Sequence, residues 1–243
     1  MSVKPSAIGA QLLSAAIFDI DGVLLASPHE QAWREALAGF TDPDRLTPEV
    51  YQEEVAGKPR LEGAFAALAA LGVPQAERVA SIYAVRKQVK LEALIRGGKV
   101  AAFPDALRFV HALKTMGLPM AAASSSRNAA AMMRSIRFDH DDSLLEVFDA
   151  DVSGREITRG KPDPEIFLAA ARALGAQPAH CFVIEDSPAG IRAARAGGMT
   201  ALGVARRNDA EGLSSVGADL VVRSLDEIDL DALGVGHLRK RAS

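Results

Sequence analysis

Residues 15–25 have the sequence AAIFDIDGVLL, in which two carboxylates follow an apolar run. The run before Gly22 is too short for a helix, so it predicts a buried strand. Side chains two apart on a strand share a face, so Asp19 and Asp21 can converge on one reactant while Ile20 points into the core. Two carboxylates this close repel each other unless a cation lies between them or they do different work. The pattern therefore favours a magnesium-assisted reaction that uses a nucleophile and an acid/base partner.

The same D-x-D-G pattern also occurs in solvated turns and in calcium-binding loops. A calcium loop is excluded, because it needs a Glu six residues after its Gly, where this chain has Pro28. The choice between a solvated turn and a catalytic site depends on partners at the ends of other strands.

After about residue 100, short apolar runs alternate with helix-like segments. Strands are expected at 118–124, 147–152, 181–184, 200–204 and 220–222, and helices at 104–116, 126–136, 164–174 and 188–196. This alternation predicts an α/β fold, with a Rossmann-like parallel sheet and helices on both of its faces. Ligands of such sheets bind beyond the carboxyl ends of the strands, where Asp19 and Asp21 are expected.

The segment between the first strand and residue 100 is rich in Ala, Leu, Glu, Lys and Arg, and it predicts a small all-helical cap domain. Four apolar side chains recur at spacings of four, three and three, on one face of a helix that ends before Gly72: Leu61, Phe65, Leu68 and Leu71. A second helix is expected over 75–95. The expected division is an α/β core of residues 1–28 and 101–243, with a cap of residues 29–100.

Hydroxyl groups follow the strand expected at 118–124. They belong to a cluster that also opens a helix: Ser124, Ser125, Ser126, Arg127 and Asn128. Hydroxyls and free backbone N–H groups at a helix N-terminus make an anion site, to which Arg127 adds charge. An ordinary serine N-cap is the alternative.

Two further strand ends carry charged side chains. Lys161 precedes a helix with Asp163 as its expected N-cap and Pro164 at its first position. Prolines on both sides of Asp163 stiffen this loop, so Lys161 can neutralise a phosphoryl group from a fixed place, although such a lysine is usually solvated. Glu185 and Asp186 end another strand, and they are surplus to helix capping. Beside the first two aspartates, they are tolerable only around a cation.

The sequence thus has four polar motifs, with a helical insert after the first: Asp19 with Asp21, Ser124, Lys161, and Glu185 with Asp186. In this order they resemble the motifs of the haloacid dehalogenase-like superfamily of phosphotransferases. The insert resembles the cap of its β-phosphoglucomutase-like branch, and the resemblance covers nearly the whole chain. It implies that Asp19 is the nucleophile, which forms an aspartyl-phosphate, and that Asp21 is the acid/base group. The presence of Asp21 argues against the dehalogenase branch.

The resemblance also implies a cofactor and its ligands. Mg²⁺ would bind the Asp19 carboxylate, the backbone carbonyl of Asp21 and Asp186, with assistance from Glu185. The transferring phosphoryl oxygens would be held by Ser124 and Lys161.

The substrate class is expected to depend on the cap. Residues 57–60, GKPR, resemble the G-x-x-R of this branch, in which the Arg holds a distal phosphate. Lys87 and Arg127 occupy places similar to two further basic residues of the branch. Three cationic groups favour a substrate with a second anionic group, such as a sugar bisphosphate. A solvated charge is the alternative for each, and we prefer it for Lys58 and Arg86.

The hinge between Gly22 and Trp33 is about two residues shorter than the pattern of the branch. Ser27 can stand where the family has Ser or Thr, but the offset of the following His is altered. In the mutase this His helps to position the acid/base group, so its displacement argues against mutase activity. His29 either substitutes from its shifted position or lies at the surface, and Trp33 either resembles a cap position or packs in the core. The expected substrate-binding residues are Ser27, His29, Trp33, Gly57, Arg60, Lys87, Ser125, Ser126, Arg127 and Asn128.

We therefore expect a Mg²⁺-dependent phosphatase of a small phosphorylated sugar or related metabolite. A β-phosphoglucomutase-type mutase is the first alternative, because it shares every core residue. A non-catalytic regulator that binds a phosphorylated metabolite is disfavoured, because no core residue is missing. The segment 138–154 is longer than expected and carries no functional interpretation.

Composition limits the partners and the compartment. The net charge of −3 with scattered Lys and Arg argues against nucleic acid, and no apolar run of 18 residues suggests a membrane span. Cys181 is the single cysteine, so no intrachain disulfide is expected. The N-terminal stretch lacks the apolar region of a signal peptide, which favours a cytoplasmic protein. We expect a monomer, with a dimer as the alternative.

Overall fold

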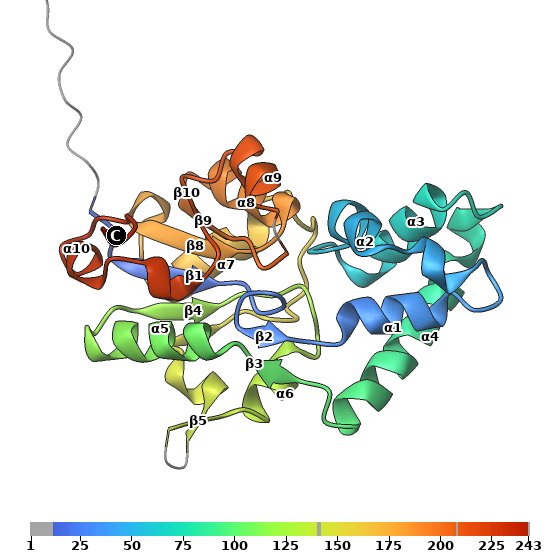
Figure 1. Ribbon diagram of the computed structural model, residues 1–243, viewed down its shortest axis with the longest axis horizontal. Helices are drawn as coiled ribbons and strands as arrows, with labels where there is room; N and C mark the ends of the chain where they lie inside the picture. Colours follow the sequence, from blue (N-terminus) through green and yellow to red (C-terminus); the bar gives the residue numbers. More distant parts are fainter. Residues whose placement is uncertain (1–11, 140–141, 208, 243) are drawn as a thin grey trace, which may run out of the picture.

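The computed structural model describes residues 12–139, 142–207 and 209–242. Its central sheet is parallel, in the order β10-β9-β8-β1-β4-β7 (Figure 1). The strands are β1 (Ala15–Phe18), β4 (Met120–Ala122), β7 (Ala150–Asp151), β8 (Cys181–Glu185), β9 (Thr200–Val204) and β10 (Leu220–Val222). The predicted α/β fold is confirmed.

Helices cover both faces of this sheet. They are α5 (Pro104–Thr115), α6 (Ala129–Arg134), α7 (Glu165–Ala173), α8 (Pro188–Ala196), α9 (Ala210–Ser215) and α10 (Leu230–Gly234). Alternate side chains of β1 enter different hydrophobic clusters. Ala16 and Phe18 join the cluster that includes residues of α5 and α6, while Ala15 and Ile17 join the one that includes residues of α7 and α8. The apolar run of β1 therefore serves two cores, which explains why it does not alternate with polar residues.

Four helices lie between β2 (Leu25–Ala26) and β3 (Ala101–Ala102), which pair as a short antiparallel ribbon. They are α1 (His29–Ala36), α2 (Pro48–Glu54), α3 (Arg60–Ala70) and α4 (Ala76–Arg96). They pack around a hydrophobic cluster of their own, which includes Trp33 and Tyr83. Figure 1 shows them as a helical cap beside the sheet. The exact division at residues 28 and 100 stays a prediction.

Small residues decide which face of α3 is buried. Leu68 and Leu71 are buried, but Leu61 and Phe65 are 58% and 47% exposed, so the four do not form one packing face. The buried face is completed instead by the residues around Gly63, where a Cβ atom would lie 3.4 Å from both Trp33 and Val55. The close approach of Trp33 and Val55 to Gly63 sets the orientation of this helix. The spacing of the large apolar residues does not reveal this contact.

Two helix starts differ from the predictions. The helix expected from Ser126 begins at Ala129, because serine hydroxyls bond the preceding loop: the Ser124 hydroxyl accepts from the Ser126 N–H (3.1 Å), and the Ser126 hydroxyl accepts from the Asn128 N–H (3.3 Å). The helix expected from Pro164 begins one residue later, at Glu165. Its N–H still donates to the Asp163 carboxylate, at 3.0 Å.

The segment 138–154 contains more elements than the single strand predicted at 147–152. It holds part of a two-stranded ribbon, β5 (Arg137–Asp139) with β6 (Asp142–Ser143), and then the edge strand β7. Residues 140–141 of this segment lie outside the described residues. The 3₁₀ helices are η1 (Pro43–Arg45), η2 (Leu144–Val147), η3 (Pro178–His180) and η4 (Leu225–Glu227). Across the described part of the chain, no helix is long and apolar enough to cross a membrane.

Candidate active site

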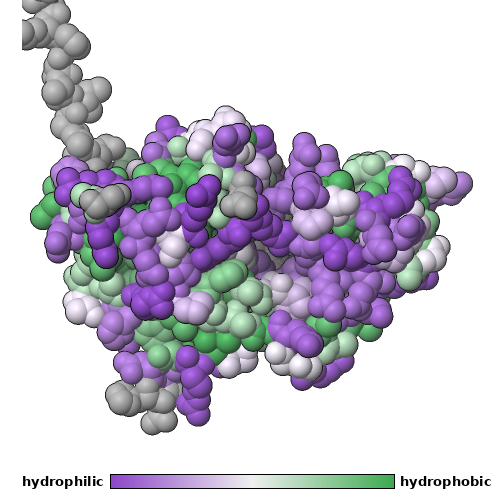
Figure 2. Space-filling model, in the orientation of Figure 1, coloured by the Kyte–Doolittle hydropathy of each residue, from purple (hydrophilic) through white to green (hydrophobic). Residues whose placement is uncertain are grey.

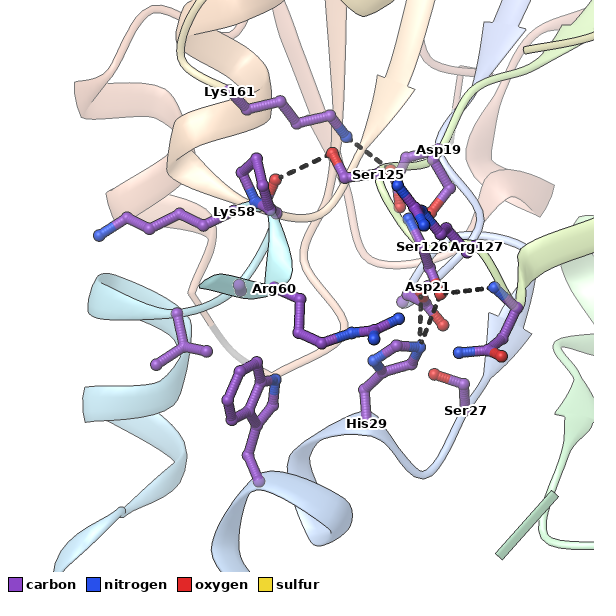
Figure 3. A pocket seen from close by; sticks show the side chains of 18 of the residues that line it. Asp19, Asp21, Ser27, His29, Lys58, Arg60, Ser125, Ser126, Arg127 and Lys161 are labelled. Atoms are coloured by element: carbon purple, nitrogen blue, oxygen red, sulfur yellow. Dashed lines mark hydrogen bonds and ion pairs between the residues drawn. The ribbon is translucent and has the colours of Figure 1, made fainter. Parts of the chain in front are cut away.

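A cavity of about 860 Å³ lies between the carboxyl ends of the strands and the cap. Every residue that the sequence nominated as catalytic, metal-binding or substrate-binding lines it. Hydrophilic side chains gather where the core and the cap meet (Figure 2), and Figure 3 shows the side chains that converge there. The structure thus brings the nominated residues together, while their roles stay predictions.

Lys161 bridges two of the carboxylates at the floor of the cavity. Its Nζ lies 2.5 Å from Asp19 Oδ1 and 2.8 Å from Glu185 Oε2, and all three side chains are buried. Burial by itself lowers the pKa of Lys161, but the two carboxylates outweigh it and raise the pKa above its ordinary value. The lysine therefore stays a cation beside Asp19, which the phosphoryl-binding role predicted for it requires.

Glu185 has hydrogen-bond partners at both carboxylate oxygens. While Oε2 accepts from Lys161, Oε1 accepts from the backbone N–H of Ser187 at 3.1 Å and from its hydroxyl at 2.5 Å. The same hydroxyl accepts from the Gly190 N–H and caps α8. The Ser187 cap was predicted from the sequence, and it also orients Glu185.

Asp19, Glu185 and Asp186 form an acidic cluster whose ligand atoms lie within 4.8 Å of one another. Burial, and then the charge of Glu185, raise the pKa of Asp19 to about 8, although Lys161 acts in the opposite direction. The same two causes raise the pKa of Asp186 well above its usual value. One lysine does not neutralise three carboxylates, and oxygen ligands of this kind suit Mg²⁺. The residues present therefore fit a divalent cation.

Gly22 makes room for one member of this cluster. A Cβ atom at this position would lie 1.9 Å from Asp186 Oδ2, and the backbone there has φ +85°. Glycine meets both demands, because it has no Cβ atom and adopts positive φ without steric cost. The Gly of the D-x-D-G motif thus lets the Asp186 carboxylate lie against the turn that follows Asp21.

Asp21 faces His29, the first residue of α1. His29 Nε2 lies 3.4 Å from Asp21 Oδ2 and 3.3 Å from the Ser126 hydroxyl, while Nδ1 lies 2.7 Å from Lys87 Nζ. When Lys87 is protonated, its ammonium group only donates, so Nδ1 then accepts from Lys87 and the ring proton lies on Nε2, toward Asp21. Burial lowers the pKa of His29 to about 4 and that of Lys87 to about 7. His29 therefore reaches the acid/base candidate from its shifted position and does not lie at the surface.

The second oxygen of Asp21 has a different environment. Oδ1 is buried and has no hydrogen-bond partner among the described residues. A buried oxygen of this kind carries a desolvation cost unless a ligand group bonds it. Asp21 is thus held at one oxygen by His29 of the cap, while its other oxygen is buried without a protein partner in the described part of the chain.

The cap contributes positively charged side chains to the cavity. Arg60 extends into the cavity toward His29 and Asp21, whereas Lys58 points away (Figure 3). Lys58 pairs with Glu54 at 3.8 Å. Arg86 lies outside the cavity lining and donates to the Ala38 carbonyl at 2.9 Å.

Trp33 packs in the core of the cap and also lines the cavity, so the structure agrees with both interpretations offered for it. Its ring lies 5.1 Å from that of Tyr83 in the core of the cap, and it also lines the cavity, where Lys87 Nζ lies 4.9 Å above it. The contact of a cation with an aromatic face partly offsets the burial of that charge.

Several residues that the sequence did not nominate join the cap to the core. Gln52 of α2 donates to the Asp186 carbonyl at 2.8 Å, and Arg207 Nη1 lies 2.6 Å from Glu30 of α1. Gln88 of α4 exchanges hydrogen bonds with Asn128. No local pattern marks these residues, because each contact depends on how the cap sits on the core.

Comparisons with known proteins agree with this geometry. The model of the haloacid dehalogenase-like hydrolase family matches residues 13–198. The chain belongs to this family. It is 34% identical to the β-phosphoglucomutase of Bacillus subtilis over 231 residues, which cover 91% of this chain and 94% of that protein.

A phosphatase and a solved structure are also similar. Hexitol phosphatase A of Escherichia coli is 29% identical over 214 residues, 87% of this chain and 91% of its own. The crystal structure of the β-phosphoglucomutase from Pyrococcus sp. strain ST 04 superposes with a TM-score of 0.71 at 33% identity, covering 90% of this chain and 96% of that one. These similarities confirm the β-phosphoglucomutase-like branch.

Proposed function

We propose that the protein is a Mg²⁺-dependent phosphatase of a small phosphorylated sugar or related metabolite, and that it works through a phosphoaspartate on Asp19. The observation that carries the proposal is the state of Asp21: Oδ2 is held by His29, while the buried Oδ1 lacks a partner in the described structure. An acid/base group must present one oxygen to the reacting group. The proposal gives this oxygen its partner, the leaving oxygen of the substrate.

The side chains divide the reaction into two displacements. In the first, a carboxylate oxygen of Asp19 attacks the phosphorus, the bond to the leaving oxygen breaks, and the Asp21 carboxylic acid protonates that oxygen. In the second, the Asp21 carboxylate takes a proton from water, whose oxygen attacks the phosphorus while the bond to Asp19 breaks. Lys161 holds charge beside Asp19 in both steps, and Ser124 offers its hydroxyl to the phosphoryl oxygens.

The metal would be held by the acidic cluster of Asp19, Glu185 and Asp186. It would neutralise the negative charge of the phosphoryl group and of the cluster. Glu185 already bonds Lys161 and Ser187, so we assign the direct ligands to Asp19 and Asp186 and a supporting place to Glu185.

The positive charge of the cavity supports a substrate with a second anionic group. Arg60 and Lys87 of the cap line the cavity together with Arg127 of the core, and similarity to sugar-phosphate enzymes agrees with a phosphorylated sugar.

Mutase activity is the second candidate, and one observation favours it. The shortened hinge argued against a mutase because of the displaced His, but His29 reaches Asp21 and Lys87 in the structure. In a mutase the sugar hydroxyl would replace water in the second displacement.

The test is phosphate release from a panel of sugar monophosphates and bisphosphates with Mg²⁺, beside an assay for the conversion of β-glucose 1-phosphate to glucose 6-phosphate. We expect steady phosphate release and no isomer. We also expect the isosteric variant Asp19→Asn to lose at least a thousandfold in kcat, because it lacks the nucleophile. Isomer formation that depends on a sugar bisphosphate would establish the mutase, and full turnover by Asp19→Asn would refute the role of Asp19.

A further inference from the structure

A chain of three side chains runs from the surface of the cap to the cavity. Gln88 Nε2 donates to Glu92 Oε1 at 2.6 Å and to Asn128 Oδ1 at 3.1 Å, and Asn128 Nδ2 donates back to Gln88 Oε1 at 3.2 Å. Glu92 and Gln88 lie on α4 of the cap, whereas Asn128 lies in the core loop before α6. Of the three, only Asn128 lines the cavity.

The carboxylate at one end fixes the orientation of both amides. An ionised carboxylate only accepts hydrogen bonds, so the Gln88 atom that faces Glu92 must be the nitrogen. The Gln88 oxygen then faces Asn128 and needs a donor, so the Asn128 atom that meets it must also be a nitrogen. The direction of each amide therefore follows from chemistry, although N and O atoms of an amide have nearly the same shape.

This orientation determines what Asn128 can offer a ligand. Its Oδ1 is occupied by Gln88, and one of the two N–H groups of Nδ2 is occupied as well. The second N–H has no acceptor among the described residues. Asn128 therefore has one free N–H to donate to a ligand in the cavity, which Arg60 and Lys87 also line and where their charges favour an anionic oxygen.

We propose that Gln88 and Glu92 are positioning residues, which present the free N–H of Asn128 to an anionic oxygen at the cap end of the substrate. The inference rests on the proposed function, since it assumes a phosphorylated substrate with a second anionic group. Without Gln88, the Asn128 amide is free to turn its oxygen toward that anion, where it would repel it. The pair also acts only when the cap lies on the core, so this donor is presented in the closed arrangement.

The experiment compares Gln88→Ala with wild type on two substrates. Fructose 1,6-bisphosphate carries a second anionic group, and phenyl phosphate does not. We expect KM for the bisphosphate to rise about tenfold, the effect of losing a hydrogen bond to a charged group. We expect kcat/KM for phenyl phosphate to stay within twofold. Equal losses on both substrates would indicate general damage to the cap and would overturn the inference.

Gln31 provides the matched control. Its amide donates to Glu35 at 2.8 Å, with the same spacing of four residues along a cap helix, and the pair is exposed. We expect Gln31→Ala to leave both substrates unchanged. If it raises KM for the bisphosphate as much as Gln88→Ala does, the inference is wrong.

A double-mutant cycle separates positioning from other effects. In an Asn128→Ala background, Gln88→Ala and Glu92→Gln should each add less than twofold, because the side chain that they orient is absent. Glu92 also attracts Arg60, and an effect through that contact would persist in the Asn128→Ala background. Additive losses would therefore overturn the inference.

Binding separates this inference from the proposed function. In Asp19→Asn chains, calorimetry should show that Gln88→Ala weakens the binding of fructose 1,6-bisphosphate about tenfold, with no such change for phenyl phosphate. This pattern would support the inference even if no phosphate were released by the wild-type protein. Unchanged affinity, or no binding of the bisphosphate, would overturn it, whatever the turnover.

Discussion

Lys87 loses its proton at a lower pH than an ordinary lysine, because the fold buries it. Only 3% of its surface is exposed, and burial lowers its pKa to about 7. Its Nζ touches His29 and the face of Trp33, and neither carries a formal negative charge. An anionic substrate group in the cavity would supply the missing counter-charge and raise the pKa again.

This state of Lys87 predicts proton uptake on substrate binding. At pH 8 most of Lys87 is neutral, whereas a phosphate monoester is already a dianion, because its second pKa is about 6. Binding of glucose 6-phosphate should therefore take up as much as about one proton. Calorimetry at pH 8, in buffers of different ionisation enthalpy, measures this number.

The variant Lys87→Met is the control for this measurement. It keeps a long apolar side chain over Trp33 but has no titratable group, so proton uptake should vanish. Uptake that persists in Lys87→Met would assign the proton to another group. No uptake in the wild-type protein would show that Lys87 is already charged at pH 8.

The cap meets the core at a glycine, which makes docking of these elements testable. A Cβ atom on Gly160 would lie 2.1 Å from Cδ of Pro59, the residue just before α3. The φ angle of Gly160 lies outside the left-handed region, so the core itself tolerates alanine there. A side chain at position 160 would therefore collide with the cap and push it away from the core.

We predict that Gly160→Ala holds the cap away from the strand ends. A displacement of about 1 Å at a site of this kind can cost on the order of 100-fold in turnover, and we expect kcat/KM to fall by that order. Gly212→Ala in α9 is the control, because no atom lies within 4 Å of its added Cβ. It should keep full activity. Steady-state kinetics and thermal unfolding of both variants measure these effects, and an unimpaired Gly160→Ala protein would show that the Pro59 contact is absent from the reactive form.

Local signals explain which elements were predictable from the sequence. The start of α8 was predicted correctly, because Ser187 and Pro188 form a cap within three residues. The predicted start of α6 was wrong. The hydroxyls of Ser124 and Ser126 accept hydrogen bonds from N–H groups of the loop, so the helix begins only after it. In both cases the serine hydroxyl accepts a backbone N–H, and only the surrounding fold decides whether a helix or a loop follows.

The same reasoning separates the two halves of the candidate site. Most of the core residues were found because they stand at the end of an apolar strand, and parallel strands bring their carboxyl ends to one edge. Lys161 lies instead in the loop between β7 and α7, and it was found from the prolines that stiffen this loop. Gln52 and Gln88 were missed, because their partners lie 134 and 40 residues away across the boundary with the core. Sequence periodicity carries no information on how the cap is placed over the sheet.

At the scale of the whole molecule, the charge in the cavity is unbalanced. The core contributes three clustered carboxylates and one lysine around Asp19, while the cap contributes the cations Arg60 and Lys87. Because burial and Glu185 raise the pKa of Asp19 to about 8, the folded protein without metal holds a proton there that the unfolded chain releases near pH 4. Between about pH 4 and pH 8, the titration of Asp19 therefore lowers the free energy of unfolding as the pH rises.

Magnesium should therefore stabilise the folded protein more at pH 8 than at pH 5.5. At the lower pH it must displace protons from Asp19 and Asp186, whose pKa values are both raised. At pH 8 and tenfold over its Kd, Mg²⁺ should add about 1.4 kcal/mol, or about 3–6 °C in Tm. Thermal unfolding with and without Mg²⁺ at the two pH values tests this. The increment should disappear in Asp186→Asn, and equal increments at both pH values would contradict the competition between metal and protons.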